Sequence, residues 1–175
     1  MGGENSMKKL VLLVVSFLMA NILFADPFGL KMGMTLDEIK AKCGGKEAEY
    51  ECNGFVYKIN PIKKDGTFTD YSAYVHDNFG LFGVSAVTEL VSTERRKKVF
   101  NEVLSKLKYY YGEPSVVDEL TCCWYADKCE NLKKEKLYVI SLRIFEVTEL
   151  GGEMIFLDYF FENSDKALES ADSPF

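Results

Sequence analysis

The chain has 175 residues, of which 47% are hydrophobic and 27% are charged, and its formal net charge is −6. This composition fits one globular domain, and the negative charge argues against a nucleic-acid partner. A single histidine, His76, leaves little material for imidazole chemistry or a zinc site, so we predict no enzyme, no metal and no cofactor.

The first 25 residues have the pattern of a secretory signal peptide. Two lysines precede an uncharged run over residues 10–25, which is shorter than the roughly 20 residues that span a bilayer. We expect cleavage after Ala25, export to the periplasm or the medium, and no membrane span in the mature chain; a permanent anchor is the alternative. Residues 26–163 then form one domain, and residues 164–175 form a tail.

A short helix opens the mature chain. Thr35 and Glu38 have the spacing of a capping box, in which each side chain accepts a hydrogen bond from a backbone N–H at the helix start. Two glycines follow residue 43, so we expect this helix over residues 35–43.

A β-hairpin is expected next, around Asn53–Gly54. An Asn-Gly pair between two alternating runs is typical of a two-residue turn. Such a turn places Tyr50 opposite Tyr57 and Cys52 opposite Phe55.

A second hairpin is expected from strands over residues 68–76 and 81–91. Its turn is apolar where loops are normally polar, so it either folds back on the core or presents an apolar tip to a partner. We predict binding residues in this turn, namely Phe79, Leu81 and Phe82.

One long amphipathic helix, over residues 93–111, organises the predicted fold. Apolar residues recur in it at steps of three and four, which gives it one stripe that must be covered. Ser92 or Thr93 can cap its first turn, and Gly112 with Pro114 ends it.

A second candidate binding patch is expected near the end of this helix. Neighbouring helical residues are about 100° apart, so the three tyrosines at residues 109–111 cannot all face inward. We predict that Tyr109 lines the surface together with Trp124 and Tyr125. Ordinary exposure without a binding role is the alternative.

The remaining strands are expected over residues 121–126, 137–147 and 153–161, with a charged loop over residues 127–136. The last strand is apolar on both faces and should lie centrally in the sheet. The sum is an α+β fold, in which about seven strands form an antiparallel sheet of hairpins and both helices pack on one face.

Five cysteines remain after removal of the signal peptide, and an oxidising compartment favours disulfides. Cys43 is expected to pair with Cys52. Cys129 can reach Cys122 or Cys123, which point to opposite faces of one strand, and we predict that Cys123 pairs with it. A thiol nucleophile with His76 as base is the less ordinary alternative.

Three short motifs carry a resemblance. FGLKMGMTLDE over residues 28–38, YGEP over residues 111–114 and DYFFEN over residues 158–163 resemble segments of small exported bacterial proteins of unknown function. More remotely, the two helix boundaries resemble modules of β-lactamase-inhibitor proteins and of small outer-membrane-assembly lipoproteins. The resemblance implies two helices on an antiparallel sheet and a role in binding another protein.

We therefore predict an exported, non-catalytic and monomeric domain that binds a protein or an envelope component, through a sheet face or through the turn at residues 79–82. The alternative functions are a small-ligand carrier with an aromatic pocket between helix and sheet, and a thiol-dependent enzyme.

Overall fold

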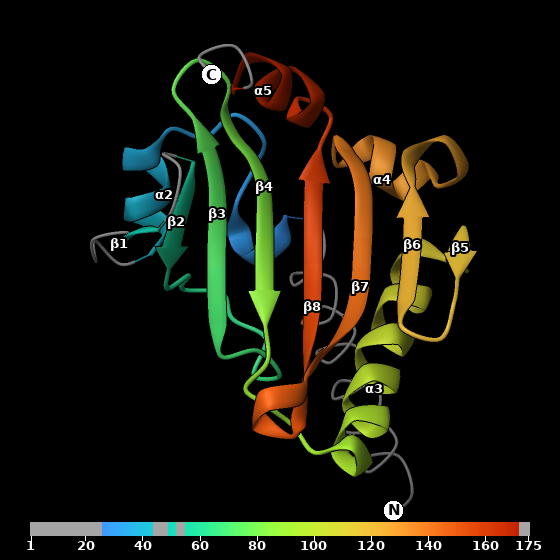
Figure 1. Cartoon of the computed structure of the whole chain (residues 1–175). Helices are drawn as coiled ribbons and strands as arrows, with labels where there is room; N and C mark the ends of the chain where they lie inside the picture. The colour runs from blue at the N-terminus through green and yellow to red at the C-terminus, as the bar shows by residue number, and fades with distance from the viewer. Residues whose placement is uncertain (1–25, 44–48, 52–54, 172–175) are drawn as a thin grey trace, which may run out of the picture.

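The computed structural model describes residues 26–43, 49–51 and 55–171, which form one antiparallel sheet of eight strands with helices around it (Figure 1). The strands follow one another across the sheet in the order β1-β2-β3-β4-β8-β7-β6-β5. Their bounds are Glu49–Glu51 (β1), Val56–Ile59 (β2), Asp70–His76 (β3), Gly80–Val87 (β4), Val116–Val117 (β5), Thr121–Tyr125 (β6), Leu137–Val147 (β7) and Gly152–Phe161 (β8).

Four α-helices and three short 3-10 segments connect or flank the strands. The helices are α2 (Leu36–Lys42), α3 (Thr93–Tyr111), α4 (Glu130–Lys134) and α5 (Ser164–Ala171), and the 3-10 segments are η1 (Pro27–Gly29), η2 (Ala126–Lys128) and η3 (Thr148–Leu150). The α+β class, the antiparallel sheet and the central position of β8, between β4 and β7, confirm the predicted architecture.

Both predicted helices form where their capping signals place them. Thr35 and Glu38 make the reciprocal hydrogen bonds of a capping box at the start of α2. Ser92 caps α3, because its side chain accepts a hydrogen bond from the Arg95 N–H, and Gly112 ends that helix with a φ of 82°. Glycine adopts this left-handed backbone without the steric cost of a Cβ atom.

The first hairpin has the predicted register, because Tyr50 pairs with Tyr57. Its turn and Cys52 lie outside the described residues. In the second hairpin, β3 and β4 pair from Asp70 opposite Val87 to His76 opposite Gly80, with an irregularity after Tyr74.

One face of the sheet carries the hydrophobic core. The buried stripe of α3 contributes Val103, Leu107 and Tyr111 to it. Phe28 of η1 adds a ring that meets Tyr71 and Tyr159 edge to face, with centroids 4.8 and 6.0 Å apart. Edge-to-face contacts place the positive rim of one ring on the negative face of another, so these rings fix η1 on the sheet.

One expectation about local structure is wrong, because the predicted loop at residues 127–136 contains α4, whose Leu132 is fully buried. The tail begins with α5, whose Ala167 is buried. The short edge strand β5 was not predicted; it pairs with β6 through Val116 and Val117.

Within the described part of the chain, no helix combines the length and the apolar composition needed to cross a membrane.

Candidate interaction surface

The sheet has a second face, which we call the open face because it is turned away from α3 and η1. Figure 1 shows the sheet from this side, with η1 behind β4 and β8. Successive residues of a strand point to opposite faces, so Leu157 and Tyr159 of β8 enter the core while Phe156, Asp158 and Phe160 stand on the open face.

Strand register arranges the open face into rows that run across the strands. The central row is polar, and each of its members is paired with the next one on the neighbouring strand. We call it the polar row, and its members are Lys58, Ser72, Ser85, Asp158, Ser141 and Cys123.

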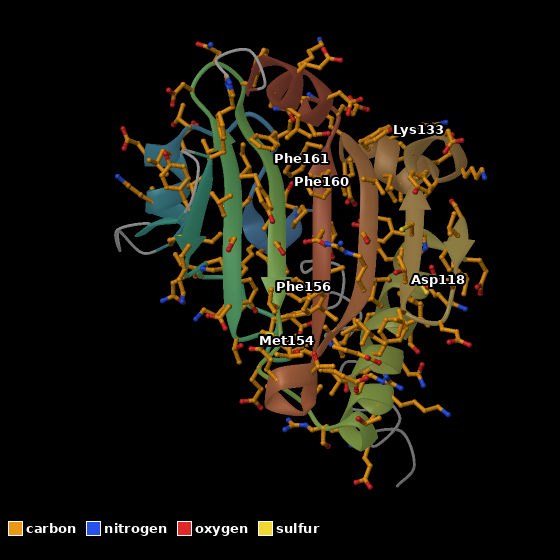
Figure 2. All side chains as sticks on the ribbon, in the orientation of Figure 1. Asp118, Lys133, Met154, Phe156, Phe160 and Phe161 are labelled. Carbon is orange, nitrogen blue, oxygen red and sulfur yellow. The ribbon has the colours of Figure 1, made fainter. Side chains whose placement is uncertain are left out.

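A row that contains aromatic residues lies on each side of the polar row. The row toward α5, called the Tyr74 row, consists of Tyr74, Gly83, Phe160, Val139 and Tyr125. The row toward η3, called the Phe156 row, consists of Val87, Phe156, Arg143 and Thr121, and the pair Phe145 and Met154 follows beyond it. In Figure 2, Met154, Phe156 and Phe160 follow one another along β8.

Asp158 is the centre of the polar row. Its Oδ1 accepts a hydrogen bond from Ser85 Oγ at 2.6 Å, and its Oδ2 accepts one from Arg143 Nη2 at 2.7 Å. The Asp158 side chain is 3% exposed, whereas the Arg143 side chain is 53% exposed. A carboxylate buried in this way needs hydrogen-bonded partners, and one of these partners presents a guanidinium group to the solvent.

Tyr74 extends this polar centre. Burial raises the pKa of its hydroxyl, the nearby Asp158 carboxylate raises it further, and Ser85 and Arg143 act in the opposite direction. The phenol therefore stays protonated beside the carboxylate, as a neutral group with a donor to offer.

Aromatic rings surround the polar centre on both sides. Tyr74 lies 6.0 Å from Phe82 and 5.7 Å from Phe160 between ring centroids, while Phe145 meets Phe156 edge to face at 6.2 Å. Phe145 is 60% exposed, and Phe156 and Phe160 are half-buried. Large rings that keep contact with the solvent on an ordered strand are available to a partner.

Gly83 allows two of these rings to approach the sheet. A Cβ atom at this position would stand 2.9 Å from the Phe160 ring and 3.1 Å from the Tyr74 ring. The missing side chain therefore lets the rings of Tyr74 and Phe160 close over β4 from both sides.

One end of the open face is closed by α5. His76 lies on the same side of β3 as Tyr74, two residues further along the strand, and its Nε2 is 2.9 Å from Ser170 Oγ of α5. The Asn78 N–H donates to His76 Nδ1 at 3.1 Å, so Nε2 carries the proton of the neutral ring and donates to Ser170. Asn163 adds hydrogen bonds to the carbonyl oxygens of Phe79 and Leu81 at 3.0 and 3.1 Å.

The predicted binding turn folds back on the protein. Leu81 is fully buried, Phe82 is 3% exposed, and Phe79 is half-buried against the His76 ring at 5.0 Å. Leu81 and Phe82 thus pack on the protein, while Phe79 keeps part of its side chain exposed.

The second predicted patch is not assembled. Trp124 is fully buried and donates from Nε1 to the Gly112 carbonyl at 2.9 Å, which fastens β6 to the end of α3. Tyr125 lies in the Tyr74 row on the open face, whereas Tyr109 is an exposed residue of α3. These three residues therefore belong to three different environments.

The described cysteines are free thiols. The predicted disulfide between Cys123 and Cys129 is wrong, because Cys123 lies on the open face beside Ser141, and Cys129 packs against the core and donates to the Tyr111 carbonyl at 3.2 Å. Cys43 is buried, and its predicted partner Cys52 lies outside the described residues. Burial raises the pKa of the Cys43 thiol, which keeps it protonated and unreactive.

His76 lies between Ser170 of α5 and the ring of Phe55. The proton of its Nε2 points toward Ser170, whose own hydroxyl donates to the Ala167 carbonyl at 2.9 Å. In this arrangement the histidine is a donor to the serine and does not act as its base. Its ring is stacked on Phe55 at 5.4 Å, as in a structural contact.

A void between α3 and the sheet, lined by Phe28, Phe68 and Tyr159 among others, measures about 10 Å3, which is room for about one water molecule. A larger cavity of about 470 Å3 lies beside α3, and threonines, charged residues and two valines line it.

Sequence reasoning missed the polar centre of the open face. Arg143 lies 15 residues before Asp158 along the chain, and Ser85 lies 73 residues before it. Only the strand order brings the three together. A signal in the sequence was Asp158 itself, which interrupts the alternating set Met154, Phe156 and Phe160.

No known protein family matches the chain, and comparison with curated proteins and with solved structures likewise finds no match.

Proposed function

We propose that the chain is an exported binding domain without catalytic activity, and that it recognises a segment of another protein on the open face. The observation that carries this proposal is the ion pair of Asp158 and Arg143, which lies among the aromatic rings of the Tyr74 row and the Phe156 row. Arginine and aromatic side chains are the residues most enriched at the centres of protein interfaces.

Arg143 has the properties of an anchor for a partner. Only one of the five N–H donors of its guanidinium is used in a hydrogen bond to a described residue, and Asp158 fixes its position. Phe156 lies beside it in the same row, and Phe145 is close by. A partner that supplies an acceptor and an apolar side chain would satisfy the arginine and cover the rings at once.

Site-specific photocrosslinking tests the proposal. We would replace Phe145 by a photoreactive phenylalanine analogue in producing cells, irradiate them, and identify crosslinked proteins by mass spectrometry. A defined crosslinked protein is expected at position 145, and Arg143→Gln in the same chain should reduce its yield several-fold. The matched control carries the analogue at Tyr109, which is 65% exposed on α3.

The crosslinking yields at positions 145 and 109 show whether the partner binds the open face. Equal crosslinking from positions 145 and 109, or a yield that Arg143→Gln leaves unchanged, would remove the open face as the binding surface. Export is tested separately by amino-terminal sequencing of the protein recovered outside the cytoplasm, for which we expect Asp26 as the first residue.

A further inference from the structure

We propose a second site, separate from the open face, in which a cavity at the end of β8 binds a small organic anion through its carboxylate group. The cavity measures about 300 Å3, which is at the lower end of the range for ligand pockets. It is lined by Asp26, Lys31, Met32, Lys134, Glu135, Lys136 and Phe161.

Glu135 is the central group of this cavity. It follows α4 directly, and its Oε2 accepts a hydrogen bond from the Tyr111 hydroxyl at 2.8 Å. Burial raises the pKa of Glu135 to about 7, and the Asp26 carboxylate raises it further, while hydrogen bonds from Tyr111 and Tyr110 act against this shift. The carboxyl group therefore changes its charge near neutral pH.

The tyrosines behind Glu135 do not titrate in the same range. Burial raises the pKa of Tyr110 to about 12 and raises that of Tyr111 beyond it, and the buried Tyr159 behind them is shifted in the same direction. These hydroxyls remain protonated, so they do not change the charge of the cavity between pH 6 and pH 8.5.

Three lysines supply the positive charge. Lys31 is paired with Asp26 at 3.4 Å, whereas Lys134 and Lys136 form no ion pair with any residue in the described ranges. When Glu135 is neutral, the lining carries three positive charges and one negative charge. When it is ionised, the excess falls to one.

Lys136 occupies a backbone conformation that favours glycine. Its φ is 56°, in the left-handed region that is unfavourable for a residue with a Cβ atom. Its carbonyl accepts a hydrogen bond from the Glu162 N–H at 3.0 Å, which fixes the strained residue between α4 and β8. Backbone strain of this kind is concentrated at functional sites, and here it places a lysine at the cavity.

The chemistry of these groups favours a carboxylate over other anions. A protonated Glu135 can donate its O–H to one carboxylate oxygen, a lysine can bind the other, and Met32 with Phe161 provides an apolar wall for the rest of the molecule. A dianion such as phosphate at high pH would meet the charge of Asp26 and, once ionised, that of Glu135.

Titration of the full chain with benzoate, acetate and inorganic phosphate tests this site, with binding followed by amide chemical shifts in NMR spectra. Benzoate should shift the amides around Glu135 and bind more tightly than acetate. If only the protonated carboxyl binds the anion, affinity at pH 8.5 should be about 30-fold weaker than at pH 6.

Two variants test the roles of Glu135 and of the lysines separately. Glu135→Gln keeps a neutral side chain at all pH values, so its affinity for benzoate should be the same at pH 6 and pH 8.5. The double change Lys134→Ala with Lys136→Gly should lose at least tenfold in affinity, and glycine at position 136 relieves the left-handed backbone, so this variant should fold. Lys97→Ala with Lys98→Ala, on the exposed surface of α3, is the matched control.

The proposal would be overturned by benzoate affinity that does not change with pH, or by unchanged affinity in the Lys134 and Lys136 variant. Phosphate that matches benzoate in affinity and in the shifted amides would show a general attraction of anions to lysines and would also overturn it. Phe145→Ser should bind benzoate like the wild type, so the outcome here does not depend on the function proposed for the open face.

Discussion

The two faces of the sheet are built from the same strands and are held in different ways. On the covered face, neighbours such as Leu142 and Leu157 pair across β7 and β8 and are buried under the helices. On the open face, the same two strands pair Ser141 with Asp158 and Arg143 with Phe156. One face is therefore stabilised by apolar burial, and the other by a few specific polar contacts.

The difference indicates where stability and recognition reside. A buried ion pair is seldom more stabilising than apolar residues of the same size, so a sheet under selection for stability alone would have no need of Asp158. Its presence is understandable if its task is to hold Arg143 in place on an aromatic surface. Substitutions on the two faces should then separate folding from binding.

The largest effect is expected from the covered face. Leu107→Ala removes a fully buried side chain of α3 and should lower the free energy of unfolding by about 2–5 kcal/mol. Phe145→Ala, on the open face, should change it by less than about 0.5 kcal/mol. Urea denaturation of both variants measures the contrast, and similar losses at the two positions would contradict the assignment of the faces.

An intermediate effect is expected at the polar centre. Asp158→Ala leaves the buried Ser85 hydroxyl without its acceptor and should cost about 1–3 kcal/mol. Arg143 can turn to the solvent, so its own desolvation adds little. The free energy of unfolding from urea denaturation checks the value.

The matched variant Asp158→Asn keeps an acceptor for Ser85 and should recover part of the loss. A double-mutant cycle of Asp158→Ala with Ser85→Ala should show coupling between them. Purely additive effects would mean that the hydrogen bond between Ser85 and Asp158 contributes nothing to stability.

The sequence predicted best those features whose causes are local. The capping box of Thr35 and Glu38, the stripe of α3 and the register of Tyr50 opposite Tyr57 each depend on residues within one element or one turn. These signals act before any tertiary contact forms, so the chain order alone reveals them.

The features that escaped prediction are tertiary. Trp124 became a core residue because α3 ends next to β6, where the Gly112 carbonyl meets the indole N–H. The turn that contains Phe79 is bound by Asn163, which lies 84 residues further along the chain, just before α5. The partners of a side chain across a sheet depend on strand order, and no local pattern encodes that order.

Glu135 gives a smaller effect that depends on pH. Burial raises the pKa of Glu135 to about 7, above the ordinary value of about 4.3. At pH values between these two, the Glu135 carboxyl group is protonated in the folded state and ionised in the unfolded state. Its contribution to stability is complete below pH 4.3 and is lost as pH rises through 7. Between pH 5 and pH 8, the free energy of unfolding of the wild type should fall by on the order of 1 kcal/mol relative to that of Glu135→Gln. The effect is small because water screens a half-buried charge.

Urea denaturation at both pH values measures this difference. Parallel pH profiles of the wild type and Glu135→Gln would show that Glu135 titrates in the same range in both states. Glu119→Gln, at an exposed position that forms no ion pair with any described residue, controls for the charge change alone.

The smallest effect is expected at the contact between α5 and the open face. Ser170→Ala removes the acceptor of the His76 Nε2–H and should cost about 0.5 kcal/mol, since water can replace the serine at this exposed residue. Amide hydrogen exchange should speed up in α5 and stay unchanged in β4, because only the helix loses a contact. Ser170→Thr keeps the hydroxyl and should exchange like the wild type, and the single histidine of the chain reports the loss directly through its Nε2 resonance. Faster exchange in β4 as well would mean that α5 stabilises the sheet itself, and the two faces would then not be separable at this end.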